Sequence, residues 1–217
     1  MDLHIVMQRL PVLLKGSEMT IELTVLTIIF GSLLGVLLAL LKISKNKVIS
    51  NIATFYIWIF RGTPLLLQIF FIYYALPMTI PSLTLTPFTG ATIALSLNCG
   101  AYMAEIIRGG IVSIDKGQFE ACKALGFTYG QTMFKVVLPQ TFRVIIPPVG
   151  NQFISMLKDT SLVSTIAMVE LMRTAQEIYA ATFKPTEIFA TTAVLYLLMT
   201  TVFSTVFNSI EKKLSVY

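Results

Sequence analysis

Residues 20–41 read TIELTVLTIIFGSLLGVLLALL, and this stretch decides the fold class. It holds a single ionisable side chain, Glu22, close to its start. About 20 mostly apolar residues are enough for an α-helix to cross the hydrocarbon core of a bilayer. The stretch therefore predicts a membrane-spanning helix. Its Gly31-Ser-Leu-Leu-Gly35 segment either forms a small-residue face for close helix contact or reflects chance, because glycine is common in such helices.

Four further stretches qualify as membrane spans by the same criterion. The second stretch is interrupted by Arg61-Gly-Thr-Pro64, and the fourth is more polar because it contains Pro147-Pro148 and Asn151. We predict an all-α, polytopic membrane protein with one transmembrane domain over residues 1–217, five spans and no cleavable signal peptide. The four additional spans are Ile52–Leu76, Phe88–Val112, Val144–Ile166 and Ile188–Ile210.

The composition excludes several classes of protein. Hydrophobic residues make up 55% of the chain and charged residues 12%, whereas a soluble domain carries about 25% charge. The 16 Lys and Arg residues lie between the apolar runs rather than in one patch, which argues against nucleic acid as a partner. The chain has one histidine, His4, and the cysteines Cys99 and Cys122 lie in unlike surroundings. We therefore expect no metal site, no cofactor and no disulfide.

The connecting charges predict which side of the membrane each loop occupies. Cytoplasmic loops are enriched in Lys and Arg. One set of loops contains ten basic residues and the other contains five, so the first set is predicted to be cytoplasmic, with the N-terminus outside and the C-terminus inside. The richer set is Lys42, Lys45, Lys47, Arg108, Lys116, Lys123, Lys135, Arg143, Lys212 and Lys213, and the poorer set is Arg9, Lys15, Lys158, Arg173 and Lys184.

The longest predicted inner connection, residues 113–143, has features of its own. Long loops inside compact domains are often functional. Residues 117–125 favour a helix, and Gly126, Gly130 and Pro139 follow as breaks. We predict a short helix outside the bilayer and parallel to it. The outer segment 167–186 also has helical character.

This inner connection carries a specific motif. It reads Glu120-Ala-Cys-Lys-Ala-Leu-Gly126 and continues to Val136-Val-Leu-Pro139. It resembles the EAA loop of membrane subunits of bacterial ABC importers, in which Glu-Ala-Ala and Gly precede Ile-x-Leu-Pro at the same spacings. Cys122 and Val136 depart from the pattern, and both keep a small or apolar side chain.

The resemblance extends over most of the chain, from about Lys15 to Lys213. The segments Phe60-Arg-Gly-Thr-Pro-Leu65, Asn98-Cys-Gly-Ala-Tyr-Met-Ala-Glu105, Arg108-Gly-Gly110 and Lys158-Asp-Thr-Ser-Leu162 look like the polar amino acid branch of that family. The resemblance implies a type I importer permease in the bacterial inner membrane. It also implies a second permease subunit, identical or different, two cytoplasmic ABC ATPase subunits, and an extracytoplasmic amino acid-binding protein.

The motif residues are candidates for contact with an ATPase partner. The chain has no phosphate-binding Gly-rich loop ending in Gly-Lys-Ser/Thr, so we expect it to be non-catalytic and to depend on a partner for ATP hydrolysis. A short helix that ends near a glycine can enter a groove of that partner, although Glu120 and Lys123 are otherwise an ordinary solvated pair. The predicted coupling residues are Glu120, Ala121, Lys123, Ala124, Gly126, Leu138 and Pro139.

Polar side chains inside the spans are candidates for substrate binding, because an ionisable residue facing lipid is costly. Helical spacing puts Asn98, Tyr102 and Glu105 on one face of the third span, and Gln152, Ser155 and Asp159 on one face of the fourth. The alternatives are that Glu105 pairs with Arg108 and Asp159 with Lys158. The predicted substrate-binding set is Asn98, Tyr102, Glu105, Gln152, Ser155, Asp159, Thr160, Arg61 and Thr63.

Two questions about function stay open at this point. Arg61 either contacts a substrate carboxylate or satisfies backbone carbonyls freed by Pro64. Glu105 and Asp159 favour a basic amino acid as substrate, unless either acid meets the α-ammonium that all amino acids share. The leading prediction is the permease subunit of a polar amino acid importer. The alternatives are a self-sufficient ion-coupled carrier and a membrane anchor without transport activity.

Overall fold

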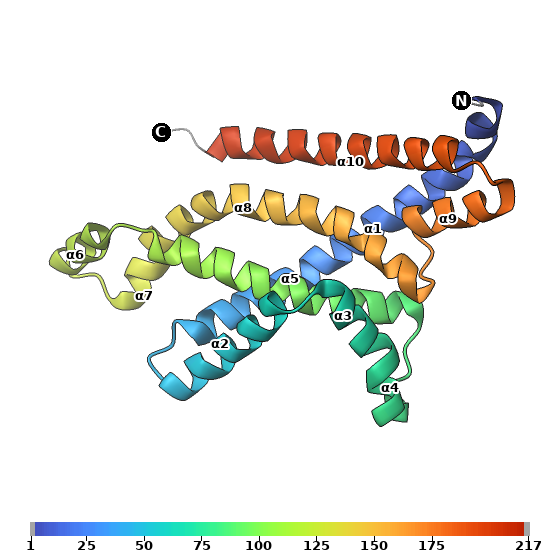
Figure 1. Ribbon diagram of the computed structural model, residues 1–217. Coiled ribbons are helices and arrows are strands. Elements are labelled where there is room, and N and C mark those ends of the chain that lie inside the picture. The colour runs from blue at the N-terminus through green and yellow to red at the C-terminus, as the bar shows by residue number, and fades with distance from the viewer. Residues whose placement is uncertain (1–2, 215–217) are drawn as a thin grey trace.

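Helices account for the regular structure of the described chain (Figure 1). The computed structural model describes residues 3–214, and within that range it contains α-, 3-10 and π-helices and no strand. The predicted all-α class is therefore confirmed. Three helices are long and apolar enough to span a membrane, namely α1 (Leu3–Lys42), α5 (Pro87–Val112) and α10 (Pro185–Leu214).

The first helix packs closely along α5. An added Cβ at Gly31 would lie 2.7 Å from the Cβ of Cys99, and one at Gly35 would lie 2.5 Å from the Cβ of Met103. Both distances are too short for real side chains, so the two glycines let the helices approach each other. The small-residue face is confirmed as a packing surface. However, α1 begins well before the predicted start at Thr20 and continues through Pro11.

The second predicted span is broken rather than continuous. Helix α2 (Lys47–Gly62) and the helical segment after Pro64 are bent by 106° relative to each other, and together they qualify as one broken span. After the break the chain runs through α3 (Leu65–Phe70), the π-helix η1 (Phe71–Ala75), α4 (Leu76–Thr79) and the 3-10 turn η2 (Pro81–Leu83).

The fourth predicted span corresponds to α8 (Leu138–Asp159) followed by the 3-10 helix η4 (Thr160–Ile166). It begins six residues before the predicted Val144, and the prolines at 147 and 148 lie inside the helix without ending it. Helix α8 is not among the helices that qualify as spans by length and composition. It nevertheless runs beside α5 and α10 (Figure 1). The five-span count stays a prediction.

Short helices lie at the two ends of the bundle. The predicted helix in the inner connection is confirmed as α6 (Lys116–Ala124), and it is followed by α7 (Tyr129–Thr132) and the π-helix η3 (Met133–Val137). The predicted helical character of 167–186 is confirmed by α9 (Leu171–Thr182). The loop between α1 and α2, the pair α6–α7 and the end of α10 lie at one end of the molecule (Figure 1).

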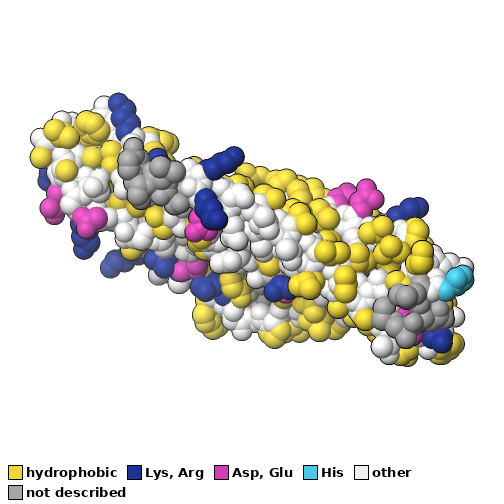
Figure 2. All heavy atoms as spheres, turned by 90° about the horizontal axis from the view of Figure 1, so that it is seen from above, with side chains coloured by type: hydrophobic (Ala, Val, Ile, Leu, Met, Phe, Trp, Pro, Cys, Tyr) yellow, Lys and Arg dark blue, Asp and Glu magenta, His cyan; other side chains and the backbone are white. Residues whose placement is uncertain are grey.

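The opposite end carries the start of α1, α4 and α9 (Figure 1). This arrangement separates the two sets of loops on which the predicted orientation is based. Figure 2 shows the same asymmetry on the face that carries α10, because most of the Lys and Arg side chains lie on the half that includes the end of that helix. We call the end with α6 the α6 end, and the other the α9 end.

Candidate functional site

The break between α2 and α3 positions one wall of the site. Pro64 has no backbone N–H, and a residue that precedes proline favours an extended backbone. Thr63 accordingly has φ −118° and ψ 148°, and it ends α2. The chain therefore leaves helical geometry at Thr63 and resumes it at Leu65, in a new direction.

Amide side chains satisfy the backbone carbonyl groups at this break. The Phe60 carbonyl accepts hydrogen bonds from Gln68 Nε2 at 2.9 Å and from Asn98 Nδ2 at 3.1 Å. Gln68 Nε2 also donates to the Thr63 carbonyl at 3.1 Å, and Asn98 Nδ2 donates to Gln68 Oε1 at 2.9 Å. These bonds fix the broken helix against α5. They also correct the alternative in which Arg61 satisfies the freed carbonyls.

A polar pocket of about 360 Å³ opens beside the break. It brings together the two predicted polar faces of α5 and α8 with the end of α2. Six of the nine predicted substrate-binding residues line it, since only Arg61, Glu105 and Thr160 lie outside its wall. The lining residues are Thr63, Pro64, Leu65, Asn98, Tyr102, Gln152, Ser155, Met156 and Asp159.

Asp159 is the only ionisable carboxylate in the wall of this pocket. The side chain is half-buried at the end of α8. Its carboxylate forms no direct salt bridge within residues 3–214, although the charge of the neighbouring Lys158 acts on it, as the predicted alternative requires. A carboxylate without a direct salt bridge, in the same pocket wall as the amide of Gln152 and the hydroxyl of Ser155, is suited to bind an ammonium or guanidinium group.

Glu105 lies outside the pocket, in an ion-pair cluster. Its carboxylate accepts from Lys42 Nζ at 2.6 Å and from Arg108 at 3.0 Å, and the nearest nitrogen of Arg61 is 3.9 Å away. The predicted alternative, a pair with Arg108, is therefore present. Lys42 comes from α1, 63 positions along the chain from Glu105, and the sequence pattern gave no sign of it. The cluster ties α1, α2 and α5 together.

Two other predicted residues lie near the pocket without lining it. The Arg61 guanidinium sits 5.2 Å from the ring centroid of Tyr102, which does line the pocket. Thr160 is fully buried, and its hydroxyl donates to the Leu157 carbonyl at 2.8 Å. The hydroxyl of Thr160 thus closes the last turn of α8 instead of facing the pocket.

One functional residue escaped the sequence analysis. Gln68 is 8% exposed, and its side chain joins Phe60, Thr63 and Asn98. It is the only amide in the otherwise apolar and aromatic run after Pro64, and it stands four residues beyond the proline. Side chains on a helix lean toward its N-terminus, so a residue one turn after the proline can reach the carbonyl groups at the break.

Five of the seven predicted coupling residues lie on α6 or in the turn that follows it. Asp115 caps the helix by accepting from the Gly117 N–H at 2.6 Å. At the other end, the Phe127 N–H donates to the Cys122 carbonyl at 2.9 Å and the Gly126 N–H to the Lys123 carbonyl at 3.0 Å. These two bonds form a Schellman motif, in which the residue after the cap adopts a left-handed conformation. Gly126 does so, with φ +76°.

Helix α6 presents its predicted contact residues to the outside. Glu120, Ala121, Lys123, Ala124 and Gly126 are all exposed. Cys122 is buried and attaches α6 to the rest of the chain. Leu138 and Pro139 start α8, where proline is tolerated because no helical hydrogen bond is lost. Leu138 is half-buried and Pro139 is exposed, and both belong to α8 rather than to α6.

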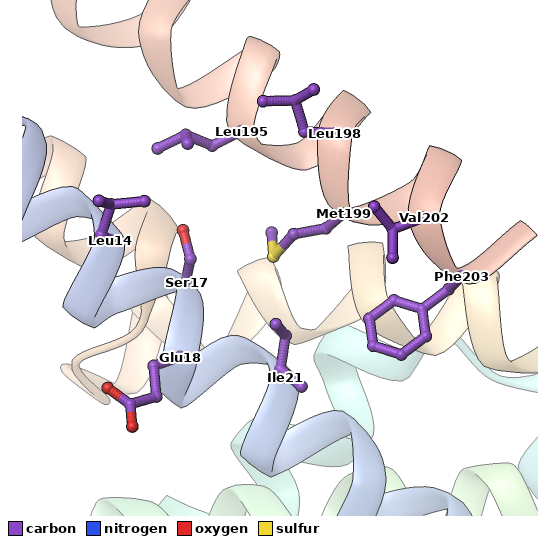
Figure 3. A pocket seen from close by; sticks show the side chains of 9 residues that line it. All are labelled: Leu14, Ser17, Glu18, Ile21, Leu195, Leu198, Met199, Val202 and Phe203. Atoms are coloured by element: carbon purple, nitrogen blue, oxygen red, sulfur yellow. The ribbon is translucent and has the colours of Figure 1, made fainter. Parts of the chain in front are cut away.

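A larger hollow elsewhere has the wrong chemistry for a polar ligand. A groove of about 490 Å³ lies between α1 and α10 (Figure 3). Its walls are mostly aliphatic, and the carboxylate of its one ionisable residue, Glu18, points away from α10 (Figure 3). Within residues 3–214, no group of three or more His, Cys, Asp or Glu side chains has a metal-binding arrangement. The polar pocket is thus the candidate site.

Comparison with known proteins agrees with this geometry. Residues 31–216 match the family described as the binding-protein-dependent transport system inner membrane component. The L-cystine transport system permease protein TcyB of Bacillus subtilis is 45% identical over 208 residues, which cover 95% of this chain and 88% of TcyB. The arginine transport system permease protein ArtQ of the same organism is 37% identical over 214 residues, covering 99% and 97% of the two chains.

A third relative and a solved structure extend the comparison. The glutamine transport system permease protein GlnP of Escherichia coli is 40% identical over 207 residues, covering 95% of this chain and 94% of GlnP. A chain of the crystal structure of an amino acid ABC transporter with histidines superposes with a TM-score of 0.93 at 38% identity, covering 98% of this chain and 99% of that chain.

Proposed function

This chain belongs to the family of binding-protein-dependent transport system inner membrane components and is a permease of an amino acid ABC importer, and from that premise we propose that its preferred substrates are basic amino acids. Membership of the family decides against the self-sufficient carrier. The relatives transport cystine, glutamine and arginine by name, so their names do not select a substrate for this chain. The choice depends on the pocket.

The observation that carries the proposal is the carboxylate of Asp159, which lines the pocket and forms no direct salt bridge within residues 3–214. The pocket wall contains this one acid and no basic side chain. A zwitterionic amino acid with a neutral side chain brings no net charge into such a pocket, whereas arginine, lysine or doubly protonated histidine brings one positive charge. Attraction between that charge and the carboxylate is strong away from bulk water. Gln152, Ser155 and Tyr102 offer hydrogen bonds to the rest of the ligand.

The partners follow from the same family. We propose that two cytoplasmic ABC ATPase subunits supply ATP hydrolysis, that α6 is the element they contact, and that a second permease subunit completes the pathway. An extracytoplasmic amino acid-binding protein delivers the substrate to the α9 end. In this arrangement the chain is a multi-pass inner membrane protein, with its N-terminus outside and its C-terminus cytoplasmic. The exposed residues of α6, at the end with most basic side chains, support this assignment.

The experiment is a substrate panel on the reconstituted complex in proteoliposomes, with arginine, glutamine and cystine as substrates. A charge-assisted hydrogen bond contributes about 1.5–3 kcal/mol, which corresponds to about one to two decades of affinity. Asp159→Asn keeps the shape of the side chain and removes its charge. We expect arginine uptake at low concentration to fall by that factor, with glutamine uptake much less affected.

Glu105→Gln is the matched control, because it removes an acid that lies outside the pocket wall. It should lower uptake of all three amino acids alike, or lower the yield of the complex. An equal loss of arginine and glutamine uptake in Asp159→Asn would assign the acid to the α-ammonium and contradict the basic preference. Unchanged uptake in that variant would remove Asp159 from the site.

A further inference from the structure

The half of α10 nearer the α6 end carries polar side chains on a surface that the rest of the described chain leaves open. Thr201, Thr205 and Asn208 are exposed, and Ser204 is half-buried. Their spacing of three, four and seven residues places them along one face of the helix. We call these four residues the α10 strip.

The α10 strip is poorly suited to contact with lipid. The hydroxyls of Thr201 and Thr205 donate to the carbonyls of Leu197 and Thr201 in their own helix, at 2.7 and 2.8 Å, so these two residues tolerate an apolar environment. The amide of Asn208 forms no hydrogen bond with any residue between 3 and 214. An amide has two donor hydrogens and an acceptor oxygen, which hydrocarbon cannot satisfy.

Helix α8 also has a polar side chain without a hydrogen-bond partner among residues 3–214, opposite the strip. A small hollow of about 100 Å³ between the two helices is lined by Asn151 from α8 and by Ser204, Asn208 and Glu211 from α10. The Asn151 side chain is exposed and, like Asn208, is not hydrogen-bonded within the described part of the chain. Pro147 also lines the hollow. Pro147 and Pro148 cannot donate to the carbonyls four residues earlier, which adds free acceptors to this stretch of α8.

This polar surface continues from the substrate pocket. Asn151 stands one helical turn before Ser155, which lines that pocket, and the hollow extends along α8 from Ile154 back to Pro147. That direction leads toward the α6 end, where α8 begins and α10 ends (Figure 1). Irregular or unsatisfied backbone at membrane depth is tolerated where it lines a water-filled cavity.

We propose that the α10 strip, Asn151 and Glu211 line a water-filled exit route, through which the amino acid passes from the pocket to the α6 end. The inference rests on the proposed function, since it assigns a route to the substrate of that site. Water satisfies the two unpaired amides without a fixed partner, and Glu211 places a carboxylate where the route opens. The second permease subunit forms the opposite wall.

The test is the water accessibility of single cysteines in the assembled complex. The background is Cys99→Ala with Cys122→Ala, since both native cysteines are free thiols. Ser204→Cys and Asn208→Cys probe the route. Val202→Cys and Val206→Cys are matched controls, because they lie on the same helix turns and are 59% and 48% exposed. The probe is 2-(trimethylammonium)ethyl methanethiosulfonate, added from the cytoplasmic side of inside-out vesicles.

Only an ionised thiol reacts, and apolar surroundings suppress ionisation, so the two route cysteines should react at least about tenfold faster than the valine-site cysteines. Their modification should also block arginine uptake. Equally slow reaction at all four sites would place the strip against lipid and overturn the proposal. A slow reaction together with oxidative cross-linking of Asn208→Cys between two copies would make the strip a dry subunit contact, which also overturns it.

The labelling does not require a transported substrate. Fast labelling of the route cysteines in a complex that fails to transport arginine, glutamine and cystine would contradict the proposed function and leave the exit route standing. Slow labelling in a complex that imports arginine would contradict the route alone.

Discussion

At the scale of single residues, Glu170 holds three helices together from a buried position. It is fully buried at the start of α9, and its carboxylate accepts from the backbone N–H groups of Met172 and Arg173 at 2.9 and 2.7 Å. It also accepts from the hydroxyls of Thr20 in α1 and Tyr196 in α10, at 3.3 and 3.0 Å. Burial raises the pKa of Glu170 above its ordinary value, although these hydrogen bonds oppose the shift.

A raised pKa in the folded protein has a defined consequence for stability. The folded state binds the proton of Glu170 more readily than the unfolded state, so this carboxyl stabilises the fold most below its unfolded pKa of about 4.3, and that stabilisation is lost as pH rises through the folded pKa. We expect the melting temperature of the detergent-solubilised chain to fall as pH rises above the unfolded pKa of Glu170. Glu170→Gln should flatten that slope, as measured by scanning fluorimetry.

The matched control for this slope is Glu120→Gln, because Glu120 is exposed on α6 and makes no hydrogen bond to α1 or α10. Its melting curve should follow that of the unmodified chain across the pH range. A Glu170→Gln variant with an unchanged slope would show that other groups produce the pH dependence.

The sequence predicted those pocket residues that helical spacing places on one face of a single helix. One pocket wall contains the predicted polar faces of both α5 and α8. These faces consist of Asn98 and Tyr102 on α5 and of Gln152, Ser155 and Asp159 on α8. Spacing along one helix cannot report a partner from another helix. For that reason the Lys42 contact that draws Glu105 into an ion-pair cluster, and the role of Gln68, emerged only from the structure.

At the scale of elements, the turn after α6 tests the coupling assignment. Gly126 has a left-handed φ of +76°, and an added Cβ would meet no atom within 4 Å. A substitution there is therefore unfavourable because of the backbone conformation and not because of a clash. Gly126→Val should displace the end of α6 at a cost of about 1–2 kcal/mol. We expect substrate-stimulated ATP hydrolysis by the reconstituted complex to fall, while the chain still inserts into the membrane.

Gly130 provides the control for this experiment. It also has open space around its added Cβ, and its φ is not positive. Gly130→Val should therefore retain most of the stimulated ATPase activity. Normal stimulation in Gly126→Val would count against α6 as the element that the ATPase contacts.

The elements differ in how well their sequences specify them. Helices α5 and α10 extend only a few residues beyond the predicted spans, because each apolar run is bounded by a proline at its start. The bend of 106° between α2 and α3 was foreseen only as an interruption, since Pro64 indicates a break without giving its angle. The angle depends on Gln68 and Asn98, which attach the break to α5.

At the scale of the whole molecule, the two ends differ in charge and in architecture. The α6 end holds the loop between α1 and α2, helix α6 and the end of α10, and the opposite end holds α9 and the start of α1 (Figure 1). Two connections and the end of α10, which are far apart in sequence, thus meet on one side, an arrangement consistent with the predicted five spans.

The charge asymmetry makes the orientation testable. Lys and Arg near span ends favour the cytoplasmic side, so the α6 end should be inside. In the background without native cysteines, Lys45→Cys is exposed in the loop between α1 and α2, and Ser82→Cys is exposed in the uncharged loop after α4. An impermeant maleimide added to intact cells should label Ser82→Cys and not Lys45→Cys. Permeabilised cells supply the control, because both cysteines should then react. Labelling of Lys45→Cys in intact cells would invert the orientation and move the proposed exit route to the outer side.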